Sequence, residues 1–226
     1  MNIIGHRGVP SLELENTVTS FKRALNMPGL QTVELDVRRT KDGQLVVCHD
    51  ADLQRVAQRN VRIKDRTLAQ LKKIPLLDGS HILSLKEALE IFEGAMHVIV
   101  EIKDEGCGRE LRRILQPLQT QSVSIASFKL RELVVYQDLG IRNQLYGLER
   151  TKPIDSIHYA KTLRLDGIGL NFWLLNPLTY ALCRKARLRI YVYTVNSRII
   201  GQLIRLLYPK ADICSDYPQK FLQAKR

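Results

Sequence analysis

The sequence predicts an α/β fold, specifically a (β/α)8 TIM barrel that forms one domain over residues 1–226. Short apolar strand-like runs alternate with amphipathic helical runs from about residue 97 onward. Two more strands near the start give eight expected parallel strands, which about 220 residues can accommodate. An open doubly wound sheet is the alternative, but its GxGxxG fingerprint is absent from His6-Arg7-Gly8-Val9-Pro10.

The expected elements follow one another in order along the chain. Strands are expected near residues 3–6, 32–37, 97–102, 122–126, 144–147, 167–170, 189–194 and 211–215. The first helix opens at Glu15-Asn16-Thr17, with Asn16 or Thr17 as N-cap, and runs to about Asn26. Ser84 and Glu87 have the spacing of a capping box. Later helices are expected near residues 84–93, 107–118, 129–139, 153–163, 177–186 and 197–207.

A β-hairpin is expected after the second strand, where Asp42-Gly43 separates two β-rich runs. The connection is too short for a parallel crossover, so the pairing must be antiparallel. A two-residue turn would place Asp36 opposite His49, and a slip of two residues would place Glu34 there instead. The polar, irregular segment that follows, about residues 50–80, indicates an insertion with one helical piece near residues 68–74.

Composition is that of a globular protein, with 45% apolar and 26% charged residues. We expect no membrane-spanning helix or signal peptide. The four cysteines show no CxxC spacing, which favours reduced thiols and a cytoplasmic location. The net charge of +12 suits a nucleic acid, an anionic membrane or a phosphate-bearing substrate. The basic residues form no stripe with interleaved aromatic residues, so we expect no nucleic-acid partner and a mostly solvated charged surface.

Polar residues in unusual places mark a candidate site. Glu34 and Asp36 are two apart in an apolar strand and so share one face, which is costly unless a cation neutralises them or the face is solvated. Glu101 lies inside another apolar strand, with Lys103 on the same side. The first strand ends at His6-Arg7, and the last strand is followed by Asp216. In a TIM barrel all these positions meet at the carboxyl ends of the strands.

These residues together suit cleavage of a phosphodiester. Glu34, Asp36 and Glu101 offer hard oxygen ligands for one divalent cation, Mg²⁺ or Ca²⁺. Arg7 and Lys103 would add positive charge to a phosphate site. His6 and His49 could divide the general acid and general base roles. Each residue taken singly is as well explained by a surface or packing role, but their conjunction at strand ends favours a catalytic site.

Eight motifs lead to a family resemblance. They are His6-Arg7-Gly8, Glu15-Asn16-Thr17 followed by Phe21, Glu34-Leu35-Asp36-Val37, Thr40-Lys41-Asp42-Gly43, Val46 through Asp50, Val100-Glu101-Ile102-Lys103, Tyr193-Thr194-Val195-Asn196 and Ser215-Asp216-Tyr217-Pro218. Together they resemble the glycerophosphodiester phosphodiesterase family over essentially the whole chain. The resemblance implies a TIM barrel whose insertion caps the site, and a Mg²⁺- or Ca²⁺-dependent hydrolase that converts glycerophosphodiesters, such as glycerophosphocholine or glycerophosphoethanolamine, to sn-glycerol 3-phosphate and an alcohol.

The resemblance also implies residue roles. Glu34, Asp36 and Glu101 would bind the metal, and His6 and His49 would be the acid–base pair. Substrate or phosphate contacts would come from Arg7, Lys103 and Tyr193, and Glu15 would contact the substrate or support the metal site. The family often has Trp where this chain has Tyr193, and the approach to the last strand also departs from the family pattern, which leaves the preferred alcohol open. Phe172 and Trp173 are candidates for the mouth of the pocket or for packing.

Two other interpretations remain open. One is a lysophospholipase D-like or sphingomyelinase D-like enzyme acting on lipids, which the positive charge would help at an anionic bilayer. The other is a barrel that binds phosphodiesters without cleaving them. The sequence does not indicate an oligomeric state or choose between Mg²⁺ and Ca²⁺.

Overall fold

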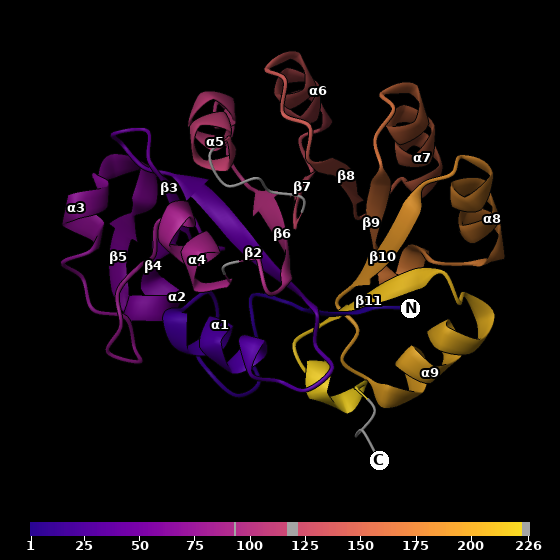
Figure 1. The fold of residues 1–226 in the computed structure, drawn as a ribbon, viewed down its shortest axis with the longest axis horizontal. Coiled ribbons are helices and arrows are strands. Elements are labelled where there is room, and N and C mark those ends of the chain that lie inside the picture. Colours follow the sequence, from indigo (N-terminus) through magenta and orange to yellow (C-terminus); the bar gives the residue numbers. More distant parts are fainter. Residues whose placement is uncertain (93, 117–121, 223–226) are drawn as a thin grey trace.

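A closed eight-stranded parallel barrel forms the body of the protein (Figure 1), seen in a computed structural model that describes residues 1–92, 94–116 and 122–222. The strands lie in the order β1-β11-β10-β9-β8-β7-β6-β2, and pairing of β1 with β2 closes the barrel. Their bounds are β1 (Ile3–Gly5), β2 (Thr32–Arg39), β6 (His97–Ile102), β7 (Val123–Ser127), β8 (Gln144–Glu149), β9 (Gly167–Asn171), β10 (Arg189–Tyr193) and β11 (Ala211–Ser215). The predicted TIM barrel is confirmed.

Helices surround the barrel and cover its outer face (Figure 1). They are α1 (Val18–Leu25), α4 (Leu85–Phe92), α5 (Gly108–Leu115), α6 (Leu130–Asp138), α7 (Pro153–Thr162), α8 (Pro177–Lys185) and α9 (Arg198–Leu207). Thr17 is the N-cap of α1 and accepts from the Ser20 N–H. Ser84 and Glu87 exchange hydrogen bonds at the start of α4, as the capping-box spacing predicts. The predicted ends of the helices at 84–93 and 107–118 include residues 93, 117 and 118, which lie outside the described residues.

The hairpin differs from the prediction in its register. Strand β3 (Leu45–Val47) is antiparallel to β2, with Val37 opposite Val47 and Arg39 opposite Leu45. Thr40 N–H donates to the Gln44 carbonyl, so a three-residue loop joins the strands, and Gly43 in it has a φ of +79°. The two-residue turn was therefore wrong. His49 follows the end of β3 and pairs with neither Asp36 nor Glu34.

The insertion is more ordered than its polar sequence suggested. It contains β4 (Asp52–Leu53), α2 (Gln54–Ala57), β5 (Arg59–Arg62), the 3-10 helix η1 (Ile63–Asp65) and α3 (Leu68–Leu71). A small apolar core of its own holds these pieces against β3, and its buried members are Val46, Cys48, Leu53, Val56, Ala57, Ile63, Leu71, Leu76 and Ile82. The expectation of an irregular segment was wrong because spaced single apolar residues, rather than a periodic run, build this core.

The main core lies between the sheet and the helices, and a second apolar cluster fills the barrel interior. Interior members include Ile99 and Tyr191, below the polar residues at the carboxyl ends of the strands. All four cysteines are free and buried, as expected for reduced thiols. Over the described ranges, each helix is too short or too polar to cross a bilayer.

Candidate active site

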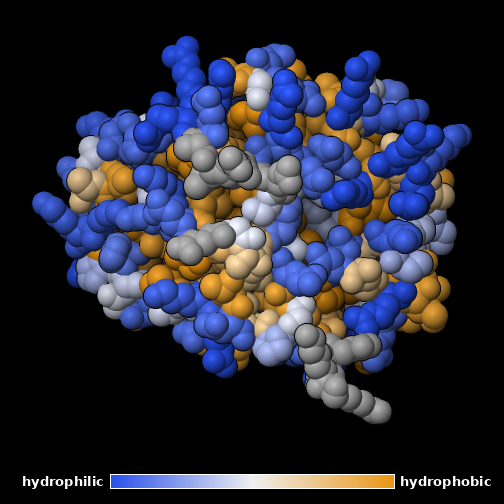
Figure 2. Space-filling model, viewed as in Figure 1, coloured by the Kyte–Doolittle hydropathy of each residue, from blue (hydrophilic) through white to orange (hydrophobic). Residues whose placement is uncertain are grey.

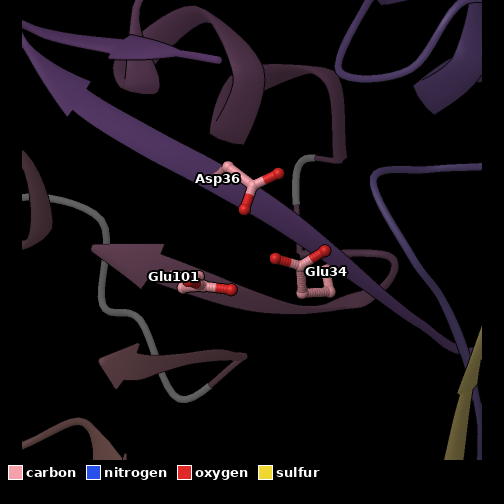
Figure 3. A group of neighbouring side chains, drawn as sticks. All are labelled: Glu34, Asp36 and Glu101. Carbon is pink, nitrogen blue, oxygen red and sulfur yellow. The ribbon is translucent and has the colours of Figure 1, made fainter. Parts of the chain in front are cut away.

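Three carboxylates from two neighbouring strands converge inside the barrel (Figure 3). Asp36 on β2 is the direct register partner of Glu101 on β6, and Glu34 lies two residues earlier on β2. Paired residues of parallel strands point to one face, so all three side chains enter the interior. One oxygen of each lies within 4.8 Å of one oxygen of the others, and all three residues are buried.

Burial makes the three carboxylates electrostatically unequal. Burial and the neighbouring Asp36 charge raise the pKa of Glu34 to about 8, and the same two causes raise the pKa of Glu101. Burial would also raise the pKa of Asp36, but the nearby Lys103 and Arg7 outweigh it and hold that pKa at about 2. The site therefore keeps one firmly ionised carboxylate beside two whose ionisation its charge and their burial disfavour.

The carboxylate set fits a divalent cation. Oε1 of Glu34 is buried and has no hydrogen-bond partner among the described residues, which is costly unless something else binds it. A cation would satisfy this oxygen and relieve the repulsion that raises the pKa of Glu34 and of Glu101. An all-oxygen donor set favours Mg²⁺ or Ca²⁺ over softer metals.

Two cations already touch the carboxylates. Lys103 Nζ lies 2.8 Å from Asp36 Oδ1 and also contacts Glu101. Arg7 Nε lies 3.1 Å from Asp36 Oδ2, and the Arg7 backbone N–H donates to Glu34 at 3.0 Å. The structure thus brings Arg7 and Lys103 to the edge of the acidic cluster, where a substrate phosphate would also be attracted.

His6 is fixed through one ring nitrogen. Its Nδ1 lies 2.6 Å from Asp216 Oδ1, and Asn196 donates to the other Asp216 oxygen at 2.7 Å. The remaining nitrogen, Nε2, lies 3.9 Å from Glu34 Oε2 and faces the cluster. Burial would lower the pKa of His6, but the hydrogen bond to Asp216 and the charge of Glu34 raise it overall.

His49 is fixed in a similar way from the opposite side. Its Nδ1 lies 2.8 Å from Asp50 Oδ1, and Arg55 of the insertion donates to Asp50 Oδ2 at 2.7 Å. Burial lowers the pKa of His49, with Lys103 and Arg7 acting in the same direction. The two imidazoles therefore differ in proton affinity although each is anchored by an aspartate at Nδ1.

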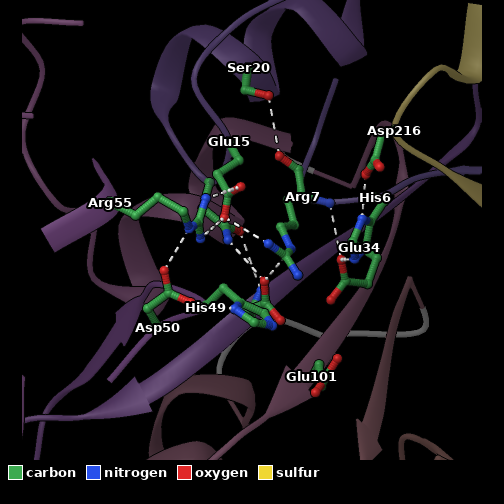
Figure 4. A network of polar contacts seen from close by, with 12 residues as sticks. His6, Arg7, Glu15, Ser20, Glu34, His49, Asp50, Arg55, Glu101 and Asp216 are labelled. Carbon is green, nitrogen blue, oxygen red and sulfur yellow. Dashed lines mark hydrogen bonds and ion pairs between the residues drawn. The ribbon is translucent and has the colours of Figure 1, made fainter. Parts of the chain in front are cut away.

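Glu15 links the insertion to the site (Figure 4). It accepts from Arg7 Nη1 at 2.9 Å and from both terminal nitrogens of Arg55 at 2.6 and 2.8 Å. A continuous chain of ion pairs therefore runs from Asp50 through Arg55 and Glu15 to Arg7. Glu15 touches none of the three clustered carboxylates in the contacts described, so its place is beside Arg7.

Tyr193 has hydrogen-bond and ring contacts with a different set of residues. Its hydroxyl donates to the Glu149 carbonyl at 2.8 Å, and its ring meets Phe128 edge-on. Arg150 stacks over that Phe128 ring, 4.2 Å from its centroid. These residues belong to β7, β8, β10 and the loops after them, and β7 is the strand next to β6, which carries Glu101. Trp173 follows the carboxyl end of β9 and is 77% exposed, so its side chain is not packed in the core.

Several site residues were not predicted individually. Asn16 donates to Asp36 at 3.0 Å, and Asp216 and Asn196 support His6. These three residues lie within the family motifs quoted above, so their place in those motifs was the sign in the sequence that they belong to the site. Arg55 had no such signal, because an arginine in a polar insertion gives no local indication of a contact with Glu15.

Comparison with known proteins identifies the family to which the chain belongs. The sequence profile of the glycerophosphoryl diester phosphodiesterase family matches residues 6–220. The chain belongs to this family. A glycerophosphodiester phosphodiesterase of Caldanaerobacter subterraneus is 27% identical, over 99% of this chain and 97% of that one. Family membership makes the protein a phosphodiester hydrolase.

Solved structures of family members share the barrel. The glycerophosphodiester phosphodiesterase of Thermotoga maritima has a TM-score of 0.84 and 27% identity, covering 97% of this chain and 96% of that one. A phosphodiesterase of Oleispira antarctica, solved in complex with its product sn-glycerol 3-phosphate, has a TM-score of 0.86 and 24% identity, covering 97% and 94%. The fold of this phosphodiesterase chain is thus that of its family.

Proposed function

We propose that the protein hydrolyses glycerophosphodiesters, such as glycerophosphocholine and glycerophosphoethanolamine, to sn-glycerol 3-phosphate and an alcohol. The observation that supports it most is the joining of three buried carboxylates, within 4.8 Å of one another, with two aspartate-anchored histidines at one end of a barrel of this family. The product found in the Oleispira antarctica enzyme agrees in chemical class.

Glu34, Asp36 and Glu101 would hold one divalent cation, Mg²⁺ or Ca²⁺. The orphaned Oε1 of Glu34 and the raised pKa of Glu34 and Glu101 support this part of the proposal. A bound cation would offset negative charge on the phosphoryl oxygens as the transition state forms.

His6 and His49 would transfer the protons. Asp216 and Asp50 bind the Nδ1 atoms, which leaves each Nε2 free to face the substrate. One histidine takes the proton from the attacking hydroxyl as the new P–O bond forms. The attacker is water, which gives sn-glycerol 3-phosphate directly, or the glycerol 2-hydroxyl, which gives a cyclic phosphate that a water molecule opens in a second step. The other gives a proton to the departing alcohol oxygen as the old P–O bond breaks. The opposite directions of their pKa shifts suit this division.

Arg7 and Lys103 would bind the phosphate, since both carry fixed positive charge at the edge of the carboxylate cluster. Glu15 would position Arg7 through their 2.9 Å ion pair. Tyr193 would line the substrate pocket together with Phe128.

Release of sn-glycerol 3-phosphate from glycerophosphocholine, measured with Mg²⁺, with Ca²⁺ and with EDTA, tests the proposal. We expect release with at least one ion and none with EDTA. Glycerophosphoethanolamine, glycerophosphoinositol and a lysophospholipid, run in parallel, would identify the preferred alcohol. Failure to release glycerol 3-phosphate from any of these diesters with either ion would contradict the proposal.

A further inference from the structure

One long stretch of the chain holds no acidic residue. Residues 167–211 contain seven of the 35 Lys and Arg of the protein but none of its 23 Asp and Glu. The seven are Arg184, Lys185, Arg187, Arg189, Arg198, Arg205 and Lys210. This stretch forms β9, the 3-10 helix η2 (Phe172–Leu174), α8, β10 and α9, so it is one continuous side of the barrel (Figure 1). More than half of the net charge of +12 therefore lies on one side.

The same side exposes large apolar residues on α9. Ile199, Leu203 and Leu206 are 70%, 51% and 76% exposed, and their spacing of four and three places them on one face of the helix. Gly201 and Ile204, on the opposite face, are buried against the barrel. Figure 2 shows apolar side chains reaching the surface at the lower right, over α9. An apolar ridge faces solvent where a monomer would present polar residues.

The ridge continues toward neighbouring elements. Leu207 widens it on α9, and Leu178 on α8 and Trp173 on η2 are also exposed by more than half. We name the exposed side chains of residues 172–210 the α8–α9 wall. Trp173 follows the carboxyl end of β9, so the wall begins at the end of the barrel where the carboxylate cluster lies.

A second copy of the chain is a poor partner for this wall. A two-fold contact would bring Arg198, Arg205 and the other basic residues against their own counterparts, and the wall has no acidic residue to compensate. A nucleic acid would match the positive charge of the wall but would leave the apolar ridge exposed to water. An anionic lipid surface satisfies both features, because apolar side chains enter the acyl boundary while Lys and Arg meet the phosphates.

We propose that the α8–α9 wall docks the protein on anionic phospholipid surfaces. Docking by this wall brings Trp173, and with it the mouth of the site, to the lipid surface. The proposal concerns where the protein acts and is independent of which diester it cleaves.

Co-sedimentation with vesicles tests the proposal. Wild-type protein is mixed with vesicles of equal parts phosphatidylglycerol and phosphatidylcholine, or of phosphatidylcholine alone. We expect sedimentation with the anionic vesicles at about 0.1 M salt, and release at about 1 M salt as the Debye length falls to about 3 Å. Protein that stays in solution with the anionic vesicles at low salt would overturn the proposal.

Paired variants locate the contact. Leu203→Gln/Leu206→Gln should weaken vesicle binding by at least about tenfold, since two apolar side chains no longer enter the lipid. The control is Leu77→Gln/Val135→Gln, which removes two other exposed apolar side chains and should leave binding within about twofold. Equal weakening by both pairs would overturn the assignment to the wall. Melting curves and turnover of a soluble diester check that both variants fold.

Charge variants give a second, independent arm. Arg184→Gln/Lys185→Gln/Arg198→Gln should reduce binding by about 10²-fold at low salt. Arg62→Gln/Lys64→Gln/Lys73→Gln removes the same charge from the insertion, on the other side of the barrel, and should reduce it far less. An equal loss of vesicle binding in the two triple variants would mean that the net charge alone attracts the protein to the lipid. It would overturn the proposal that the α8–α9 wall is the contact surface. A wild-type dimer that Leu203→Gln/Leu206→Gln abolishes, without vesicle binding, would assign the wall to self-association instead.

Discussion

Asp36 is the best-supported side chain of the site. Its Oδ1 pairs with Lys103, and its Oδ2 pairs with Arg7 and accepts a hydrogen bond from Asn16. The two positive charges keep the pKa of Asp36 low although the side chain is fully buried. Arg7 and Asn16 both have positive φ, at 54° and 57°, which is uncommon for non-glycine residues. Both side chains contact Asp36, so the two uncommon backbone conformations occur at residues that hold this carboxylate.

Glu149 provides a pH-dependent prediction. Burial would raise its pKa, but the Ser156 hydroxyl and the backbone N–H groups of residues 150–152 outweigh it and hold the pKa at about 2. A carboxylate with a depressed pKa stabilises the fold above its unfolded pKa, near 4.5, and loses that contribution as pH falls toward 2. Glu149→Gln should therefore lower the free energy of unfolding by about 1–2 kcal/mol at pH 7, after allowing for solvent screening.

Urea unfolding of wild type and Glu149→Gln at pH 7 and pH 3 measures the difference in their free energy of unfolding. The difference between the two proteins should shrink at pH 3. Glu105→Gln is the control, because that carboxylate is largely exposed and its ion pair is with the surface residue Lys129. A Glu149→Gln effect of the same size at both pH values would contradict the prediction.

At the element scale, the alternation of strands and helices was predictable because eight apolar runs of strand length are separated by helix-length amphipathic runs. The hairpin register was not. Asp42-Gly43 fits a two-residue turn and also a three-residue loop with glycine in the left-handed region, and local sequence does not choose between them. Hydrogen bonds of Thr40 with Gln44 select the longer loop.

Some residues of the site were predictable from the sequence and others were not. The carboxylate cluster followed from strand period and apolar surroundings, which fix the faces of Glu34, Asp36 and Glu101. The hydrogen bond between His6 and Asp216 did not follow, since the predicted barrel brings both residues to one end without fixing which side chains pair. Arg55 was beyond prediction because its position depends on the small core of the insertion.

The loop after β1 gives a second prediction. Gly8 has a φ of +89°, and a Cβ there would lie 2.3 Å from Ser20 Oγ. That hydroxyl accepts from Val9 N–H and donates to the Arg7 carbonyl, so a clash would displace the loop that holds His6 and Arg7. Gly8→Ala should lower stability by about 2–5 kcal/mol, from left-handed strain and overpacking together, and should reduce turnover.

Gly79→Ala is the matched control. Gly79 has a similar φ of +79°, but a Cβ added there would meet no other atom within 4 Å. Only the backbone strain of about 1–2 kcal/mol should appear there, with turnover unchanged. Thermal melts and steady-state assays of both variants decide the matter, and equal losses in the two proteins would argue against the role given to Ser20.

At the scale of the whole molecule, barrel closure creates the site. Strand β1 lies between β11 and β2, so residues from both ends of the chain meet around His6. The insertion adds a second connection through Arg55 and Glu15. The site is thus assembled only when the complete barrel forms, and its ligands should stabilise the complete fold.

Metal binding should therefore raise the melting temperature. A divalent ion at about 100 times its dissociation constant stabilises by about 2.7 kcal/mol, or about 5–10 °C for a chain of this size. Glu34→Gln/Glu101→Gln should abolish the shift and also raise the metal-free melting temperature, because two repelling buried carboxylates are removed.

Differential scanning calorimetry with Mg²⁺, Ca²⁺ or EDTA measures both effects. Glu90→Gln/Glu105→Gln removes two exposed carboxylates and should keep the wild-type shift. An unaltered metal shift in Glu34→Gln/Glu101→Gln would place the ion elsewhere.

Turnover by histidine variants tests the proposed chemistry most directly. Steady-state release of glycerol 3-phosphate is measured for wild type, His6→Ala, His49→Ala and His158→Ala, with the activating ion present. His158 is an exposed residue of α7 and serves as the control. We predict that kcat falls by about 10²–10⁴ in His6→Ala and in His49→Ala and stays at the wild-type value in His158→Ala. Wild-type turnover in both site variants would contradict the central claim that these two histidines perform the proton transfers.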